Sequence, residues 1–329
     1  MEHGFSSTTD EVLDGMDLTG RRVIVTGASG GLGEETARAL ASKGAAVTLA
    51  CRDLASGEDA ASHMRLATGN DHLDVRRLDL TDPESVRAFA AAYRGDHRHL
   101  DVLINNAGVM ACPLQRTDAG WELQLATNHI GHFLLTNLLV PLLIARNSSG
   151  GAAPTSARVV NLSSVGHKLS DVDLDDPFYE RRAYDKWDAY GQSKSANVLF
   201  TVGLEARLAS QGVHALAVHP GGIRTDLGRH LEESDMAELM RRAGVEDPEA
   251  FQAGFKTVPQ GGATSCWAAT APELEGRGGL YLEDCGIAEP AAQAGLASGG
   301  YAPRVMDPER AERLWARSED WVGERFSLA

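Results

Sequence analysis

The sequence has few cysteines and no long apolar run. Its four cysteines (Cys51, Cys112, Cys266 and Cys285) lie far apart and form no Cys-x-x-Cys pair, which argues against a zinc ribbon or a disulfide framework. No stretch reaches the roughly eighteen apolar residues that a membrane span needs. The first twenty residues carry five acidic residues and no apolar core, unlike a signal peptide. We therefore expect a cytoplasmic protein with no membrane partner.

Positive charge is scarce as well. The chain has 31 Lys and Arg against 46 Asp and Glu, a formal net charge of −15, which disfavours nucleic acid or anionic lipid as a partner. No Gly-x-Ser-x-Gly elbow is present, which removes the usual route to an acyl-transfer hydrolase. His129 and His132 lie three residues apart, but no Cys, Asp or Glu at matching spacing completes a metal set. We predict structural roles for both histidines and no metal site.

The first 160 residues alternate between strand and helix signals. Arg21–Thr26 is a β-branched run, a glycine turn follows it, and a helix is expected over 34–43. A strand, a glycine turn and a helix can hold a dinucleotide phosphate, because backbone N–H groups and the positive helix end face the pyrophosphate. The spacing of Gly27, Gly31 and Gly33 differs from the usual Gly-x-Gly-x-x-Gly, so the cluster alone could also be a plain tight turn.

The continuing alternation predicts a doubly wound α/β fold. We expect a parallel sheet with helices on both faces, a three-layer Rossmann fold in a single domain. Residues 1–20 form an acidic leader, 21–285 the Rossmann domain, and 286–329 a C-terminal loop and helix. Within the domain, 226–259 is charged, has two short helical stretches and shows no strand signal. Further strands are expected over 46–51, 73–79, 100–104, 214–219 and 279–282, and further helices over about 55–68, from 81, 118–146, 188–210 and 260–270.

The end of the second expected strand bears on cofactor choice. At this point of a βαβ unit an acid favours NAD, whereas a basic residue favours the 2′-phosphate of NADP. Cys51 stands where the acid would be, and Arg52 follows it. A solvated loop arginine is the simpler interpretation of Arg52.

Tyr190 and Lys194 are four residues apart and share one face of the helix expected over 188–210. With an effective dielectric near 20 and ~5 Å between the charges, their attraction is ~3 kcal/mol, enough to lower a tyrosine pKa from ~10 toward ~8. A proton donor near working pH suits general acid–base catalysis. Alone, the pair could equally be a surface Tyr and Lys on an amphipathic helix.

Several motifs occur together in one order. They are Thr26-Gly-Ala-Ser-Gly-Gly-Leu-Gly33, Asp79, Asn105-Asn-Ala-Gly108, Asn128, Ser164, Tyr190-x-x-x-Lys194 and Pro220-Gly221. This series resembles the classical short-chain dehydrogenase/reductases, over roughly residues 20–285. Ala50-Cys-Arg-Asp53, the segment 127–136 and the segment 187–200 are similar to the retinol-dehydrogenase-like branch of that family.

The resemblance implies a role for each matched residue. Tyr190 would exchange a proton with the substrate oxygen, Ser164 would orient that oxygen, and Asn128 would fix a water that links Lys194 to solvent. Lys194 would also hold the nicotinamide ribose. Ser163 would only pack or hydrogen-bond at a strand end. The cofactor-binding residues would be Gly27, Ser29, Gly31, Leu32, Gly33, Arg52, Asp79, Leu80, Asn106, Ala107, Gly108, Tyr190, Lys194, Pro220, Gly221 and Thr225.

These features together predict an NADP(H)-dependent oxidoreductase that prefers NADP(H) over NAD(H). Its substrate would be a carbonyl/alcohol pair of a mid-sized, largely apolar molecule, bound under a helical lid formed by 226–259. An extended-type epimerase or dehydratase also uses Tyr-x-x-x-Lys, but with a different glycine spacing. A nucleotide-sensing binding protein that lost turnover is the alternative outside enzymes. The resemblance also implies a homodimer or homotetramer, paired through helices 118–146 and 188–210.

Overall fold

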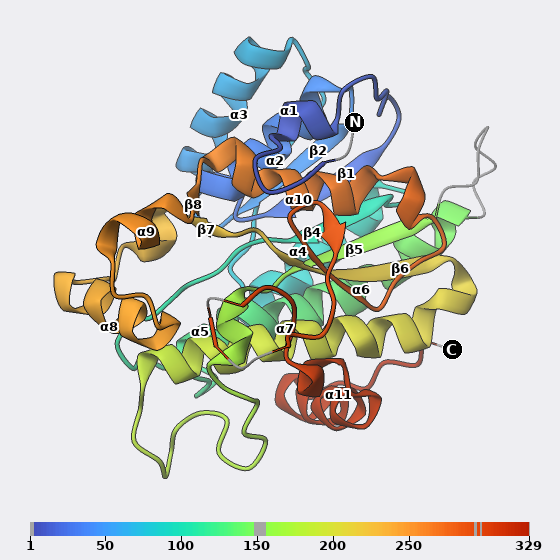
Figure 1. Ribbon diagram of the computed structural model, residues 1–329. Helices are drawn as coiled ribbons and strands as arrows, with labels where there is room; N and C mark the ends of the chain where they lie inside the picture. Colours follow the sequence, from blue (N-terminus) through green and yellow to red (C-terminus); the bar gives the residue numbers. More distant parts are fainter. Residues whose placement is uncertain (1–2, 148–155, 293–294, 297, 329) are drawn as a thin grey trace.

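An eight-stranded sheet forms the centre of the computed structural model, which describes residues 3–147, 156–292, 295–296 and 298–328 (Figure 1). Its strand order is β10-β9-β6-β5-β4-β1-β2-β3, and all neighbours are parallel except β9 and β10. The chain reverses its winding direction between β1 and β4, which is where doubly wound folds bind ligands. The strands are β1 Arg22–Thr26, β2 Ala46–Cys51, β3 Leu73–Arg77, β4 Val102–Asn105, β5 Ala157–Leu162, β6 Val213–His219, β9 Leu280–Glu283 and β10 Gly286–Ile287.

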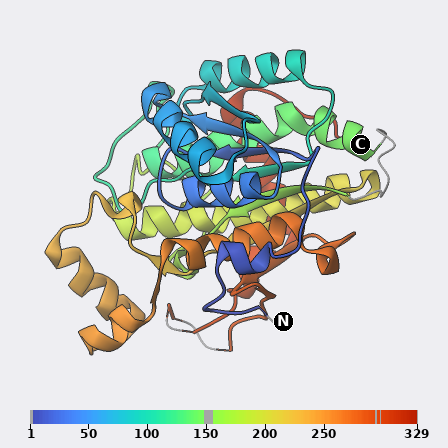
Figure 2. The same cartoon turned by 90° about the horizontal axis from the view of Figure 1, so that it is seen from above.

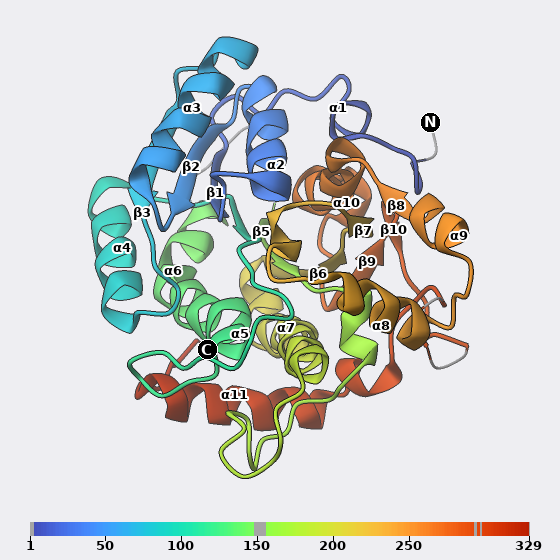
Figure 3. The same ribbon diagram turned by 90° about the vertical axis from the view of Figure 1, so that its left-hand side faces the viewer.

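Helices cover both faces of this sheet, as Figure 3 shows. Side chains alternate along each strand, so Val23 and Val25 face one helix layer and Ile24 faces the other. The expected three-layer, single-domain Rossmann fold is confirmed. The layer with Val23 contains α1 Thr9–Val12, α2 Gly31–Ser42, α3 Leu54–Thr68 and α10 Val258–Thr270; the other contains α4 Pro83–Asp96, α6 Gly131–Asn147, α7 Lys186–Leu208 and α11 Pro308–Val322.

Helix starts follow side-chain caps more closely than apolar periodicity. The expected start near 81 is α4, where Pro83 occupies the first turn and the Asp82 side chain caps the helix. Helix α7, which carries Tyr190 and Lys194, begins at Lys186 rather than 188, because Asp185 accepts hydrogen bonds from the backbone N–H groups of Trp187 and Asp188, both at 2.9 Å.

Two predictions about strands were wrong. Within 226–259 the structure has a two-residue strand, β8 (Phe255–Lys256), which pairs with β7 (Gly222–Ile223) in a small separate sheet. The expected C-terminal loop, which starts at 286, begins with β10, which turns back on β9 through positive φ angles at Asp284 and Cys285. Two-residue strands carry no periodic pattern, so only tertiary pairing reveals them.

The acidic N-terminal segment packs on the fold. Its short helix α1 contacts α10 and α2, and Val12 and Leu13 are buried in the same core cluster as those helices (Figure 2). Thr8 caps α1, and Glu11 closes the capping box.

The lid region contains α8 (Glu233–Ala243) and α9 (Pro248–Ala253). Both helices project from the body of the molecule in Figure 2.

Helix α11 covers the outer side of α6 and α7 (Figure 3). Leu314 and Trp315 are buried, and the Trp315 ring stands edge-on to Phe133 of α6 with 5.0 Å between ring centroids. Arg207 of α7 stacks 3.9 Å from the centroid of the same indole ring. A helix of the same chain therefore covers part of the two helices that we expected to pair subunits.

One stretch passes a length and composition test for membrane crossing. It is the helical run Leu123–Arg146, and 78% of its most apolar window is buried inside the fold. This run contains α5 (Leu123–Leu125), a π-helical turn (Ala126–Ile130) and most of α6, which packs between β5 and α4. Core helices of folded domains have the same composition.

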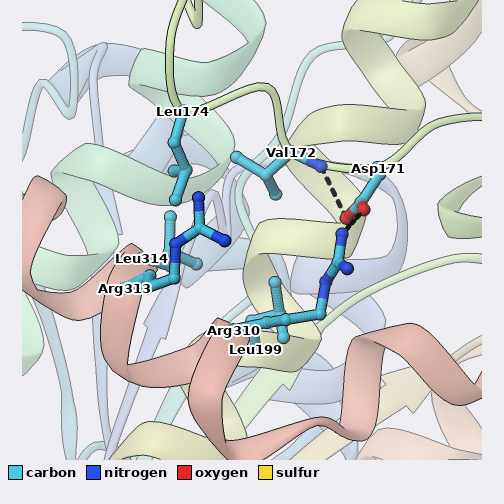
Figure 4. Close-up of a pocket in the computed structure, with 7 residues that line it drawn as sticks. All are labelled: Asp171, Val172, Leu174, Leu199, Arg310, Arg313 and Leu314. Atoms are coloured by element: carbon cyan, nitrogen blue, oxygen red, sulfur yellow. Dashed lines mark hydrogen bonds and ion pairs between the residues drawn. The ribbon is translucent and has the colours of Figure 1, made fainter.

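A cavity of about 50 Å³ lies between α7, α11 and the segment after Ser164 (Figure 4). It has room for a few water molecules. An ion pair between Arg310 and Asp171 closes one side of it. None of the residues predicted for the active site lines it; the lining residues are Asp171, Val172, Leu174, Leu199, Arg310, Arg313 and Leu314.

Candidate active site

The glycine turn leads from β1 directly into the first turn of α2. Gly27 and Gly31 have positive φ angles of 66° and 57°, which favour glycine. A Cβ atom at Gly27 would lie 2.9 Å from Ala107 Cα, and one at Gly33 would lie 2.3 Å from the Gly27 carbonyl oxygen. Gly30 provides no side-chain cap, so the first N–H groups of α2 are left without one. An uncapped helix end behind a glycine-rich turn fits a pyrophosphate.

Thr26 joins this turn to the neighbouring strand end. Its hydroxyl accepts hydrogen bonds from the backbone N–H groups of Asn106 and Ala107, both at 2.9 Å. The Asn106 side chain donates to the Thr26 carbonyl at 2.8 Å. Sequence reasoning assigned no role to Thr26, although it ends a strand beside two predicted site residues. The contacts fix the ends of β1 and β4 at the same level of the sheet.

Two arginines lie at the adjacent ends of β2 and β3. Arg52 is exposed and forms no ion pair with another described residue. Arg77 ends β3, is paired in register with Cys51, and is likewise exposed and without a described ion-pair partner. Burial raises the pKa of the Cys51 thiol, and hydrogen bonding by Ser29 opposes the rise, which places Ser29 beside this strand end. Sequence reasoning missed Arg77, because only strand pairing brings it next to Cys51.

The remaining predicted cofactor residues lie at neighbouring strand ends. The Asp79 carboxylate accepts hydrogen bonds from the Thr81 N–H (3.0 Å) and hydroxyl (2.6 Å), and Leu80 packs against Gly131. Thr225 approaches the glycine turn, since a Cβ atom at Gly31 would lie 3.4 Å from Thr225 Cβ. Leu32 opens α2, and Pro220 and Gly221 follow β6.

Asn128 lies inside the π-helical turn that precedes α6. Its side-chain N–H groups donate to the Val109 carbonyl (3.0 Å) and the Ser193 hydroxyl (2.9 Å), and its side-chain oxygen accepts from the Val109 N–H (2.9 Å). A π-turn is a frequent feature of functional sites. A Cβ atom at Gly108 would lie 3.2 Å from the Asn128 oxygen and 3.8 Å from Lys194 Nζ, so these residues converge.

The two neighbouring serines have different surroundings. Ser163 is buried, and its hydroxyl donates to the Lys194 carbonyl at 2.9 Å. The Ser164 hydroxyl accepts from the Gly166 N–H at 3.0 Å, which leaves its own proton free for another acceptor. Hydrogen bonding connects Ser164 to Tyr190. Ser164, not Ser163, is therefore the serine whose hydroxyl opposes the rise of the Tyr190 pKa.

The expected lowering of the Tyr190 pKa is not found. Burial raises the pKa of Tyr190 to about 12, and hydrogen bonding from Ser164 opposes the rise. Burial also lowers the pKa of Lys194 to about 8. The Lys194 ammonium lies 5.6 Å from the centroid of the Tyr190 ring and donates to the Leu162 carbonyl at 2.9 Å. The prediction assumed partial solvation, whereas both groups are at most 5% exposed and desolvation dominates.

The two histidines that we weighed as metal ligands are both buried and hydrogen-bonded inside the fold, although His129 Nδ1 has no partner among the described residues. His129 Nε2 lies 2.8 Å from the Ser318 hydroxyl of α11. His132 Nε2 lies 2.9 Å from the Thr26 hydroxyl, and its Nδ1 lies 3.0 Å from the Asn128 carbonyl oxygen. Burial lowers the pKa of both imidazoles, of His132 to about 4. His132 thereby connects the π-turn to the end of β1.

The lid is held to the first turn of α7 by ion pairs. Arg242 of α8 contacts Asp185 at 2.9 Å and Asp188 at 3.3 Å, and Asp235 contacts Lys186 at 2.5 Å. These charges precede Tyr190 by two to five residues on the same helix. The lid's large apolar side chains are only half-buried and belong to none of the core clusters; they are Leu227, Leu231, Met236, Leu239, Met240, Phe251 and Phe255.

Known proteins resemble this chain in sequence over most of its length. The family model for short chain dehydrogenases matches residues 21–236. An oxidoreductase of Streptomyces antibioticus is 45% identical over 310 residues, which cover 93% of this chain and 98% of the relative. Human retinol dehydrogenase 12 is 43% identical over 311 residues, which cover 94% of this chain and 89% of the relative.

Solved structures agree. The crystal structure of an uncharacterised protein from Mycobacterium paratuberculosis has a TM-score of 0.71 and 34% identity, and covers 98% of this chain and 100% of its own. A protein of Escherichia coli CFT073, described as a short chain dehydrogenase complexed with NADPH, has a TM-score of 0.59 and 25% identity. That match covers 84% of this chain and 99% of the other.

The matching fold, the matched sequence range and the named relatives point to one conclusion. The family match spans more than half of the chain, and the relatives are named as dehydrogenases or oxidoreductases. The chain belongs to the short-chain dehydrogenase/reductase family, in its retinol-dehydrogenase-like branch, and is an oxidoreductase that acts on the CH–OH/C=O pair.

Proposed function

We propose that the protein transfers a hydride between NADP(H) and a carbonyl/alcohol pair of a mid-sized, largely apolar substrate. The observation that carries this proposal is the buried Tyr190 hydroxyl, hydrogen-bonded to Ser164, at the carboxyl ends of parallel strands that also hold the glycine turn. Ligands of open α/β sheets bind at this edge. A phenol with a raised pKa is a proton donor at neutral pH, which is the form that carbonyl reduction needs.

Each catalytic residue has one task in this scheme. Tyr190 gives its proton to the substrate oxygen during reduction, and Ser164 donates a hydrogen bond to the same oxygen as negative charge develops on it. Bound NADPH would supply the hydride. Lys194 places a positive charge beside Tyr190 and toward the nicotinamide ribose. Asn128 holds the Val109 backbone and Ser193 with three hydrogen bonds, which keeps the wall behind Lys194 fixed.

The proposed preference for NADP(H) rests on the end of β2. Arg52 is exposed and free of described ion pairs, so its guanidinium is available for a 2′-phosphate. Arg77 adds a second cation on the adjacent strand end. The NADPH complex of the Escherichia coli relative supports a nicotinamide cofactor of this kind. Gly27, Gly31 and Gly33 would face the pyrophosphate.

The apolar substrate is inferred from the lid. Seven large apolar side chains of the lid are half-buried and unassigned to the core, so they can line a substrate site. The ion pairs of Arg242 and Asp235 to the start of α7 hold that surface next to Tyr190. Closure over the ligand would exclude water before hydride transfer. The alcohol or carbonyl group is the one polar anchor that the scheme requires.

The test is NADPH oxidation with a matched series of ketones and aldehydes of increasing apolar size, compared by kcat/KM and repeated with NADH. We expect kcat/KM to rise with apolar size and to be higher with NADPH. A strong preference for small charged acids would overturn the substrate assignment, as would deletion of 232–250 without loss of discrimination. Tight NADPH binding with no turnover on any carbonyl would instead support the nucleotide-sensing alternative.

The assembly and location of the enzyme complete the proposal. The family resemblance favours a homodimer or homotetramer, and α11 covers one side of the two helices expected to pair subunits. A cytoplasmic location stays a prediction.

A further inference from the structure

His167 lies three residues after Ser164 and is fully buried. It belongs to the short 3₁₀ turn Val165–Lys168, which Ser164 caps. Its Nδ1 atom lies 2.6 Å from the Ser164 carbonyl oxygen, and its Nε2 atom accepts a hydrogen bond from the Ala302 N–H at 3.0 Å. A backbone N–H can only donate, so Nε2 is unprotonated and the imidazole proton lies on Nδ1. The ring therefore donates to the catalytic serine's carbonyl and accepts from the C-terminal segment.

The second partner belongs to an arm that returns from the far end of the chain. The arm, residues 298–304, passes the end of β9, where the Gly300 N–H donates to the Glu283 carboxylate at 2.6 Å. Arg304 then donates to the His167 carbonyl at 2.7 Å. From the other side, the Ser195 hydroxyl donates to the same carbonyl at 2.9 Å. Ser195 is the residue after Lys194, so the turn is held between the catalytic helix and the arm.

An aromatic ring also packs against the His167 imidazole. The Tyr281 ring of β9 lies 5.1 Å from it, with an interplanar angle of 60°. Burial lowers the pKa of His167 to about 4, which keeps the ring neutral and both hydrogen bonds in place at neutral pH. No step of the proposed reaction uses this histidine, and a buried polar ring is costly to a fold unless its contacts are used.

We propose that His167 is a positioning residue, which sets the orientation of Ser164 and connects it to the C-terminal arm through Ala302. The Ser164 hydroxyl must point between Gly166 N–H and Tyr190, and a small rotation of the turn would misdirect it. Misplacement of a catalytic group by about 1 Å can cost up to ~10²-fold in rate. This inference rests on the proposed function only for its kinetic readout.

Three substitutions separate the two hydrogen bonds. His167→Leu removes both. His167→Asn has a similar size to leucine but carries an N–H that can reach the Ser164 carbonyl. Ala302→Pro removes only the Ala302 donor, and the Ala302 φ angle of −72° already suits proline. His214 supplies the control, because it is a buried histidine hydrogen-bonded to Glu205. It lies near the start of β6, whereas the candidate site lies at the end of that strand.

We expect His167→Leu to lower kcat by about tenfold or more and to leave the KM for NADPH within about twofold. His167→Asn should recover most of the loss, and Ala302→Pro should lower kcat by about threefold. In a Ser164→Ala background, His167→Leu should have no further effect on kcat, because its influence passes through Ser164. His214→Leu should lower stability without this pattern. An equal loss in the Ser164→Ala background would overturn the proposal.

Hydrogen exchange of residues 163–170 gives a readout that needs no activity. We expect faster exchange in His167→Leu and Ala302→Pro and wild-type exchange in His214→Leu. Unchanged exchange in both would overturn the positioning role whatever the substrate proves to be. If the wild-type protein turned over no carbonyl and exchange were still faster in these two variants, the positioning role would be supported and the proposed function refuted.

Discussion

At the scale of single residues, burial outweighs charge attraction in this site. A free Tyr–Lys pair at the effective dielectric of a protein surface would lower the tyrosine pKa, but the opposite shift occurs because solvent is excluded from both groups. Tyr190 is therefore protonated at neutral pH. Lys194, with a pKa of about 8, is mostly but not fully charged at that pH. The Tyr-x-x-x-Lys spacing predicted the pairing of these residues, but spacing contains no information about their depth.

Replacing Tyr190 with Phe keeps the ring and removes the proton. We expect kcat to fall by at least ~10² and NADPH affinity to change little, since the proton is needed only in the transition state. Tyr93→Phe is the matched control, because Tyr93 is also buried but belongs to α4. Steady-state kinetics and NADPH fluorescence titration measure the two quantities. Near-normal turnover in Tyr190→Phe would show that another group donates the proton.

Replacing Lys194 with Met should stabilise the ligand-free protein while abolishing turnover. A lysine pKa lowered from 10.5 to about 8 corresponds to at most roughly 3 kcal/mol of cost for the buried ammonium. The Leu162 carbonyl keeps a partner, because the Asn197 side chain also donates to it at 2.8 Å. We expect a gain of about 1–3 kcal/mol in the free energy of unfolding, measured by urea titration at pH 7.

The pH dependence of this effect has a definite sign. Between about pH 8 and pH 10 the unfolded chain still binds the lysine proton, whereas the folded protein has released it. Wild-type stability should therefore gain, relative to Lys194→Met, as the pH rises through this window, and the advantage of Met should shrink. An advantage that stayed constant from pH 7 to pH 10 would mean that Lys194 is not desolvated in solution.

Arg52 offers a residue-scale test of cofactor choice. Arg52→Ala should raise the KM for NADPH by about tenfold and leave that for NADH nearly unchanged, because only NADPH carries the 2′-phosphate. Arg77→Ala should act in the same direction if the neighbouring strand end contributes. Kinetics with both cofactors measure the effect. An equal loss with NADPH and NADH would identify a structural role for Arg52.

At the scale of elements, the glycine turn packs against the backbone with no space for a side chain. A Cβ atom at Gly33 would lie 2.3 Å from the Gly27 carbonyl and 2.4 Å from the Asn106 amide nitrogen. Gly33→Ala should therefore destabilise the protein by about 1–3 kcal/mol and weaken NADPH binding. Gly95 in α4 has no atom within 4 Å of its Cβ position, so Gly95→Ala should be neutral or stabilising. Thermal unfolding and NADPH titration compare the pair, and equal behaviour would contradict the close packing.

Much of the element order could be predicted, and the exceptions share a cause. Strands such as Ala46–Cys51 are long enough to show a pattern, and Pro83 marks a helix start by its own chemistry. Gly222–Ile223 and Gly286–Ile287 are too short for any periodicity and exist only because a partner strand lies beside them. The π-turn around Asn128 cannot be predicted from the sequence for a different reason. It differs from an α-helix only in its hydrogen-bond register.

The residues of the candidate site also fall into two groups: those that a sequence motif marks and those that only tertiary contacts reveal. Motifs and the family resemblance supplied the residues that we expect to touch a ligand, whereas the residues that support them came from the structure. Thr26, His167 and Arg77 acquire their contacts through strand pairing or through the returning C-terminal arm. Such contacts join positions up to 137 residues apart, so no local pattern contains them.

At the scale of the whole molecule, α11 covers part of the two helices through which the resemblance implies that subunits pair. It completes a cluster of aromatic rings with α6 and α7, in which Trp315 also lies 5.9 Å from Phe200 between ring centroids. His129 extends the contact through its hydrogen bond to Ser318. Nothing in the sequence of α7 distinguishes a face covered by its own chain from a face covered by a partner.

Undocking α11 should therefore expose an apolar face and promote association. Trp315→Asp places a charge in the aromatic cluster, where it lacks a partner, and should release the helix. We expect the mass of this variant by light scattering to rise with protein concentration above that of the wild type, because exposed apolar patches of this kind drive contact between copies. Ala316→Asp is the control, since it adds the same charge at an exposed position of the same helix. If hydrogen exchange showed that 308–322 had undocked while the mass stayed at the wild-type value, the covered face would have no tendency to pair.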